Sequence, residues 1–236
     1  MNQLKESFIL IASIFLLICS IAFITDRTQS VFFQHALLDD SRFTVVIDAG
    51  HGGFDSGKVG VDGTLEKDIN LIIAKKLEQL LIAADINVIM TRTDDTGLYE
   101  ESSNNKKRQD MKNRATLMDQ TKPDCIISIH QNSYPKESID GAQVFYYTKS
   151  EEGKLLAALI QDSLIARADP GNHRVEKSND SYYLLKNVSS PIVIVECGFL
   201  SNWAESKKLV DDTYQQKLAW AIHLGILQYL HHVTIS

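Results

Sequence analysis

The sequence has little proline, little cysteine and no excess of basic residues. It holds 4 prolines, 3 cysteines and 12 glycines in 236 residues, and no proline- or glycine-rich stretch or internal repeat divides residues 43–236. That part of the chain is therefore expected to form one domain. The formal net charge is −6 at pH 7, which argues against a nucleic-acid partner, because such binding depends on basic side chains that neutralise phosphates.

The few cysteines and the single basic cluster carry little information about function. Cys125 opens one apolar run and Cys197 follows another, as small buried residues of a sheet do. A disulfide between them stays an open alternative if the protein is exported. The basic cluster is Lys106–Arg108 followed by Lys112 and Arg114. Because acidic residues flank it, the pattern indicates the solvated face of a helix.

An uncharged apolar segment, Phe8–Ile24, stands near the N-terminus. As a helix it would span about 25 Å at ~1.5 Å per residue, slightly less than the ~30 Å hydrocarbon core of a membrane. Signal peptides and membrane anchors share this layout. The apolar run continues past the small residues Ser20–Ala22, which favours an uncleaved anchor. We expect residues 1–24 to be an anchor or signal peptide, 25–42 a tether, and 43–236 an exported catalytic domain on the outer face of the cytoplasmic membrane, or secreted after cleavage.

Beyond residue 42 the apolar periodicity alternates between strand and helix. The strand-like runs are Phe43–Ala49, Ile86–Thr91, Cys125–Ile129, Gln143–Tyr147 and Ile192–Val195. Helical spacing covers Glu66–Ala84, Gln109–Gln120, Glu152–Arg167 and Thr213–Leu230. Such alternation predicts an α/β domain with helices on both faces of a sheet, preceded by the N-terminal apolar helix.

Three of the strand-like runs end in a chemically active side chain. The first leads through Gly50 to His51, the second runs into His130, and the third runs into Glu196. Ligand sites in open α/β sheets collect at the carboxyl ends of strands. Two imidazoles and a carboxylate at such ends indicate a metal-centred active site.

A zinc hydrolase needs three protein ligands, an open position for water and a carboxylate that moves protons. His51 and His130 would supply nitrogen, and Glu66 would supply oxygen from the start of the long helix, where the helix dipole favours a carboxylate. The loop between His51 and Glu66 is rich in glycine, which lets it fold back and bring both ligands to one ion. Glu196 then remains as the proton-handling group.

Four motifs in order carry a family resemblance: Ile47–Gly57 (IDAGHGGFDSG), Leu65–Asp68 (LEKD), Ser128–Asn132 (SIHQN) and Val195–Asn202 (VECGFLSN). They resemble the zinc-dependent N-acetylmuramoyl-L-alanine amidases of the amidase-3 type, over essentially all of residues 43–230. The resemblance implies a mixed, mostly parallel six-stranded sheet with helices on both faces. It also implies one Zn²⁺ bound by His51, Glu66 and His130, with Glu196 as the catalytic carboxylate. The implied substrate is peptidoglycan, cut between N-acetylmuramic acid and L-alanine of the stem peptide.

Three further residues are candidates for supporting roles. Asn132 and Arg92 lie near strand ends and could bind substrate, although Arg92 could equally pair with Asp94 or Asp95. Asp48 could orient a ligand histidine from behind, or it could cap the turn after its strand.

The arrangement of the chain most resembles the germination-specific amidases of spore formers (the CwlD type), which prepare cortex peptidoglycan for muramic-δ-lactam formation. We expect neither the inhibitory helix of division-associated members nor an added wall-binding module. Lys58 stands where the family more often has a small residue, which would change the charge at the rim of the site. Expected partners are peptidoglycan and, through the N-terminal segment, the membrane; an activating protein stays open.

Other reaction classes remain as alternatives at this point. One is a different zinc hydrolase of the cell wall, a peptidase or a deacetylase, which would use the same ion on another bond. Another is a hydrolase that uses Cys197 as nucleophile. A non-catalytic wall-binding domain is the third, and it conflicts with the presence of all four chemical positions.

Overall fold

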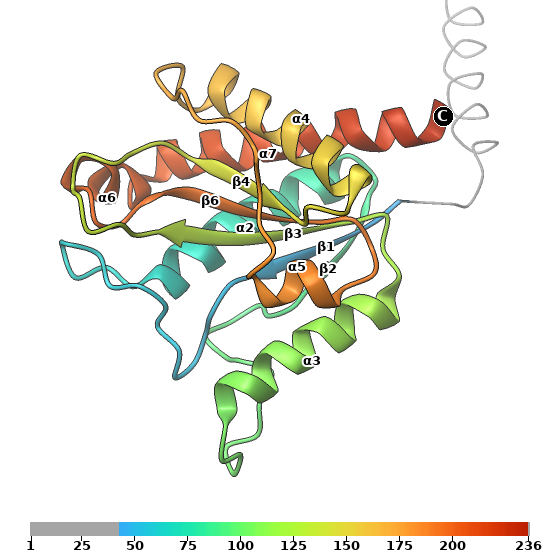
Figure 1. The fold of residues 1–236 in the computed structure, drawn as a ribbon, viewed down its shortest axis with the longest axis horizontal. Helices are drawn as coiled ribbons and strands as arrows, with labels where there is room; N and C mark the ends of the chain where they lie inside the picture. The colour runs from blue at the N-terminus through green and yellow to red at the C-terminus, as the bar shows by residue number, and fades with distance from the viewer. Residues whose placement is uncertain (1–42, 236) are drawn as a thin grey trace, which may run out of the picture. The chain divides into compact units, whose positions relative to one another are not determined.

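A six-stranded sheet forms the centre of the catalytic domain (Figure 1). The structure is a computed structural model that describes residues 43–235. The strands are β1 (Thr44–Ala49), β2 (Asn87–Met90), β3 (Cys125–Asn132), β4 (Gln143–Tyr146), β5 (Lys177–Ser178) and β6 (Ile192–Phe199), in the order β2-β1-β3-β6-β4-β5. β4 runs antiparallel to β6, and the other neighbouring strands are parallel. The expected mixed, mostly parallel sheet is confirmed.

Helices cover both faces of this sheet. They are α2 (Glu66–Ala83), α3 (Lys106–Thr121), α4 (Glu151–Arg167), α5 (Tyr183–Asn187), α6 (Trp203–Leu209) and α7 (Asp212–Ile235). α2, α4 and α7 share one hydrophobic cluster with the sheet, and α3 and α5 share the second. In Figure 1, α3 and α5 accordingly lie on the side of the sheet opposite α4 and α7.

The pleat of the strands decides which side chains face α3 and α5. Successive residues of a strand point to opposite faces, so Val45 and Ile47 join the cluster of α2, α4 and α7 while Val46 joins the other. By the same alternation, His130 and Glu196 share the face of α3 and α5. The two residues lie directly opposite each other in the β3–β6 register.

Most predicted elements occur within a few residues of their expected bounds, and two of the differences affect the site. β3 and β6 run past their predicted ends because they continue to pair as far as Asn132 and Phe199. His130 and Glu196 therefore lie inside their strands rather than just after them. β5, α5 and α6 were not predicted, since elements this short carry no readable periodicity.

Further expectations concern the N-terminal residues, membrane-spanning helices and the cysteines. The predicted apolar helix of residues 8–24 and the tether of residues 25–42 lie outside the described residues. Within residues 43–235, none of the helices combines the length and apolar character needed to cross a membrane. Cys125 and Cys197 are both buried free thiols, so the open alternative of a disulfide between them is not realised.

The basic cluster is solvated only in part, because Arg114 is buried. Its side chain is 1% exposed and lies 2.6 Å from the Asp48 carboxylate and 2.7 Å from that of Asp110. Burial alone would raise the pKa of Asp48, but Arg114 and the hydroxyls of Ser128 and Thr91 lower it to about 2. The expectation of a fully solvated helix face is therefore wrong at this position, where a buried ion pair joins α3 to β1.

Two buried guanidinium groups hold the turn that follows β1. Arg114 donates to the carbonyl oxygens of Ala49 and His51, at 2.9 and 2.6 Å. Arg92 donates to those of Ala49 and Gly50, at 2.8 and 3.1 Å. Each carbonyl of this three-residue turn thus has a charged donor, which satisfies buried polar groups that would otherwise destabilise the fold.

Replacing Arg114 should be strongly destabilising. Arg114→Met removes one partner of a buried ion pair and leaves the Asp48 carboxylate without its cation, which costs about 3–5 kcal/mol of unfolding free energy. Urea denaturation followed by circular dichroism measures the loss. The control is Lys76→Met, which removes the partner of the exposed Asp212 carboxylate and should cost less than about 1 kcal/mol. Equal losses in the two variants would contradict this role of Arg114.

Candidate active site

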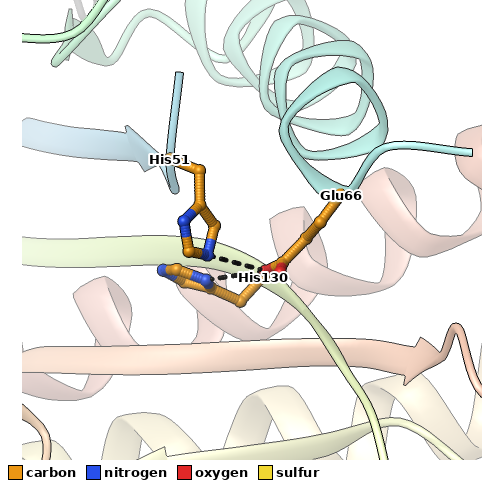
Figure 2. Close-up of side chains that lie close together, drawn as sticks. All are labelled: His51, Glu66 and His130. Carbon is orange, nitrogen blue, oxygen red and sulfur yellow. Dashed lines mark hydrogen bonds and ion pairs between the residues drawn. The ribbon is translucent and has the colours of Figure 1, made fainter. Parts of the chain in front are cut away.

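His51, Glu66 and His130 meet at the carboxyl ends of β1 and β3 (Figure 2). One nitrogen or oxygen atom from each residue lies within 4.8 Å of those from the other two. Nε2 of His51 is 3.2 Å and Nδ1 of His130 is 3.0 Å from the same oxygen, Oε1 of Glu66. The structure thus brings together the three residues that the sequence singled out as ligands.

His51 reaches this position through an unusual backbone conformation. Its φ of 62° lies in the left-handed region. This conformation is unfavourable for residues other than glycine and requires support from its surroundings. The hydrogen bond from Arg114 to the carbonyl of His51 supplies part of that support. The turn directs the ring back over the strand ends.

Asp55 orients the ring of His51. Its carboxylate lies 3.0 Å from Nδ1, which leaves Nε2 facing Glu66. Histidines that bind metals commonly donate their second nitrogen to a carboxylate in this way. Asp48 was the sequence candidate for this role, but its hydrogen bonds go to Thr91, Arg114 and Ser128. Asp48 is connected to His51 through Arg114, which contacts both residues, and the sequence analysis did not identify Asp55.

Glu66 is buried at the first turn of α2, where the chain returns from the glycine-rich loop. Its Oε2 accepts a hydrogen bond from the Lys58 amide at 2.7 Å, and its Oε1 accepts one from the Gln131 amide at 3.1 Å. Burial alone would raise the pKa of this carboxyl, but His130 and His51 hold it well below its usual range. Burial alone would lower the pKa of His51, but the carboxylates of Asp55 and Glu66 raise it to about 9.

Two glycines leave the space that these side chains occupy. A Cβ on Gly50 would lie 2.3 Å from Cε1 of His130, and one on Gly57 would lie 2.5 Å from Oε2 of Glu66. Both separations are far below a normal contact. The glycines of the first motif are therefore needed for close approach, in addition to turning the loop.

Glu196 lies beside His130 on the neighbouring strand and is 7% exposed. Its Oε1 accepts a hydrogen bond from the Tyr182 hydroxyl at 3.3 Å. Its Oε2 is buried and has no hydrogen-bond partner among the described residues. Burial, and to a lesser extent the nearby Glu66, raises the pKa of Glu196. An elevated carboxyl pKa suits a group that accepts and returns a proton.

A cleft of about 500 Å³ gives access to all four residues. Asn132 and Lys58 line it, in agreement with the positions expected from the sequence, and so does Tyr182. Arg92, the other candidate for substrate binding, does not line it. Its guanidinium is buried against the backbone, and its contact with Asp94 is to the carbonyl oxygen rather than the carboxylate.

The environment of Cys197 does not suit a nucleophile. The residue is fully buried and belongs to the hydrophobic cluster of α2, α4 and α7, on the opposite face of the sheet from Glu196. Burial and the neighbouring Glu196 charge raise the pKa of the thiol. Since the thiolate is the reactive form, the structure argues against the Cys197-dependent alternative.

The donor set at the centre of the cleft fits a divalent metal ion. Two imidazole nitrogens and one carboxylate oxygen are ligands that zinc prefers, and three protein ligands are typical of hydrolytic zinc sites with a position left for water. Glu196, whose Oε2 has no hydrogen-bond partner among residues 43–235, lines the same cleft. Fold and site together define an α/β domain with a candidate metal centre of the hydrolytic type.

Comparison with known proteins gives the family. The profile of the Amidase_3 family, N-acetylmuramoyl-L-alanine amidase, matches residues 45–228, and the chain belongs to this family. The predicted enzyme class, an N-acetylmuramoyl-L-alanine amidase, is thereby confirmed.

The similarity extends to characterised relatives and to solved structures. The germination-specific N-acetylmuramoyl-L-alanine amidase of Bacillus subtilis (strain 168) is 37% identical over 188 residues, which is 78% of each chain. LytC of the same strain is 34% identical over 79% of this chain but only 35% of its own length. The CwlD amidase from Clostridioides difficile, solved in complex with the GerS lipoprotein, superimposes with a TM-score of 0.78 at 42% identity, covering 80% of this chain and 99% of that one.

A methyl group on Gly50 should disturb the metal site without unfolding the domain. Gly50→Ala places a carbon against the His130 ring, so Zn²⁺ affinity should fall about 10–100-fold, the range for changes that misplace a ligand. Titration calorimetry of the metal-free protein measures this affinity. The control is Gly171→Ala, where the nearest atom to the added carbon is 3.4 Å away; it should bind as the unaltered protein does. Unchanged affinity in Gly50→Ala would show that His130 is not held as described.

Proposed function

We propose that this chain is a zinc-dependent amidase of the spore cortex, which cleaves the bond between N-acetylmuramic acid and L-alanine during the changes that lead to germination. The observation that carries the metal dependence is the convergence of His51, Glu66 and His130 on one point of the cleft. The cortex role is supported by the similarity to the germination-specific amidase of Bacillus subtilis and to the CwlD amidase of Clostridioides difficile.

His51, Glu66 and His130 would hold one zinc ion. A bound Zn²⁺ would act as a Lewis acid toward the scissile carbonyl and toward a water molecule. Asp55 keeps the His51 ring in the orientation that binding needs, while the Lys58 and Gln131 amides keep the Glu66 carboxylate in place. Because these supports are already formed, little rearrangement would accompany binding.

Glu196 is the proposed proton carrier, and Oε2 is its reactive oxygen. Oε1 accepts a hydrogen bond from Tyr182, whereas Oε2 has no hydrogen-bond partner among residues 43–235, and Glu196 lines the cleft. Oε2 would accept a proton from the attacking water as oxygen bonds to the lactyl carbonyl carbon. It would then return that proton to the nitrogen of L-alanine as the carbon–nitrogen bond breaks, so that the stem peptide leaves as a neutral amine. Asn132, at the cleft wall, is the proposed contact to substrate.

We further propose that the domain works outside the cytoplasmic membrane, where its substrate lies, with residues 1–24 as anchor or export signal and residues 25–42 as tether. A protein partner is also part of the proposal. It is supported by the complex of the Clostridioides difficile CwlD amidase with the GerS lipoprotein.

Replacing the proton carrier should stop the reaction and spare the metal. Glu196→Gln should lower the rate by at least about 10²-fold, because the amide cannot accept the proton, while zinc content stays near one ion per chain. Mass spectrometry of digested cortex peptidoglycan, read for free stem peptides and intact glycan, together with metal analysis, measures both. Glu152→Gln, an exposed change on α4, is the control and should retain activity. Full activity in Glu196→Gln would refute the mechanism, and cleavage at another bond would favour a peptidase or deacetylase.

Tyr182 should affect the rate through Glu196. Burial, and then the Glu196 carboxylate, raises the pKa of its hydroxyl, so the hydroxyl stays protonated and donates. Tyr182→Phe removes a hydrogen bond to a charged group, worth about 1.5–3 kcal/mol, and should lower kcat by about tenfold or more with KM and zinc content unchanged. Tyr214→Phe, a tyrosine of α7 outside the cleft, is the matched control. A change in KM alone would contradict a positioning role for Tyr182.

A further inference from the structure

The active-site cleft continues into a second hollow along α3. Lys107, Met111 and Tyr183 line both, and Arg108 and Lys112 line the second, whose volume is about 570 Å³. α3 and α5 pack against each other here, as Figure 1 shows, and together they form its floor. We refer to these five residues as the α3 shelf.

The α3 shelf carries positive charge that residues 43–235 neutralise only in part. The side chains of Arg108 and Lys112 are exposed and form no ion pair or hydrogen bond with any residue from 43 to 235. Lys107 lies 3.2 Å from Asp55 and is still 65% exposed. The nearest acidic residue on the helix, Asp110, is turned inward to Arg114. A free cationic surface is notable on a chain whose net charge is −6.

The two arms of the proposed substrate differ in charge. The glycan arm consists of N-acetylated sugars and is neutral next to the scissile bond. The peptide arm carries carboxylates, beginning with the D-glutamate that follows L-alanine. Hydrogen bonds between arginine or lysine and a carboxylate are about twice as strong as neutral ones. The charge on the α3 shelf therefore matches the peptide arm and does not match the glycan.

The distance along α3 between the shelf residues and Arg114 also suits an extended peptide of a few residues. Arg108 precedes Arg114, which binds the His51 carbonyl, by about 9 Å at ~1.5 Å per helical residue. An extended peptide covers that distance in roughly three residues at ~3.3–3.6 Å each. By the same rise, Lys112 lies about 3 Å from Arg114 along the helix axis, so a stem peptide that runs along α3 from a cut beside the metal ligands would pass Lys112 first and reach Arg108 at about its third residue.

We infer that the α3 shelf is a stem-peptide subsite, in which Arg108 and Lys112 bind the peptide carboxylates and so direct the peptide arm along α3 and the glycan arm away from it. This inference rests on the proposed function. Lys107 is less suitable for a test, because its contact with Asp55 connects it to His51. Arg108 and Lys112 have no such connection.

The test compares two substrates on the full-length chain. One is a soluble GlcNAc–MurNAc tripeptide with free carboxylates, and the other is the same compound with its peptide carboxylates amidated. The unaltered enzyme should prefer the acidic substrate. The double variant Arg108→Gln/Lys112→Gln should lose about 5–10-fold in kcat/KM on that substrate, mainly through KM, as expected for two exposed charge pairs. Its kcat/KM on the amidated substrate should stay within about twofold.

The control removes two charges elsewhere. Lys75→Gln/Lys217→Gln changes exposed lysines of α2 and α7, on the other face of the sheet, and should retain the preference of the unaltered enzyme at equal ionic strength. The inference is overturned if the unaltered enzyme does not distinguish the substrates, if the shelf variant retains the preference, or if it loses activity equally on both. An unaltered enzyme that cleaves neither substrate would instead count against the proposed function.

Discussion

The site depends on the buried guanidinium group of Arg114. This group neutralises Asp48 beneath the turn after β1 and donates to the carbonyls of Ala49 and His51. A left-handed residue in a turn with unsatisfied carbonyls would be costly, and the ring of His51 is correctly directed only while that conformation holds. Because Arg114 belongs to α3, the geometry of the candidate metal centre depends on the packing of this helix against the sheet.

The proposed ligands and the proposed proton carrier come from different elements around the sheet. Glu66 enters from the start of α2, while His130 and Glu196 project from adjacent strands toward α3 and α5. One strand spacing therefore lies between a proposed metal ligand and the proposed proton carrier. Tyr182, in the segment before α5, donates a hydrogen bond to one oxygen of Glu196, and the other oxygen has no hydrogen-bond partner among residues 43–235. The cleft is open on the side of α3, where a free cationic surface extends it.

The limits of sequence-based prediction are clearest at the charged residues. Apolar periodicity located the main strands and helices, and the motifs singled out the four residues that the cleft unites. The sequence predicts a solvated Arg114 and leaves Arg92 open between substrate contact and a pairing with Asp94 or Asp95, yet both arginines are buried against backbone carbonyls. A buried arginine and an exposed one are identical in sequence, since the difference lies in acceptors far along the chain. Asp55 and Tyr182 were missed for the same reason.

The amino-acid sequence by itself determined the class of fold, the family, and the His-Glu-His-Glu set, because apolar spacing and short motifs are local properties of a chain. Tertiary structure alone decided which carboxylate orients His51, which oxygen of Glu196 is free, and that the cleft runs on along α3. Each of these depends on hydrogen bonds or packing between segments separated by tens of residues. Such hydrogen bonds and packing contacts form only when the sheet brings these segments together.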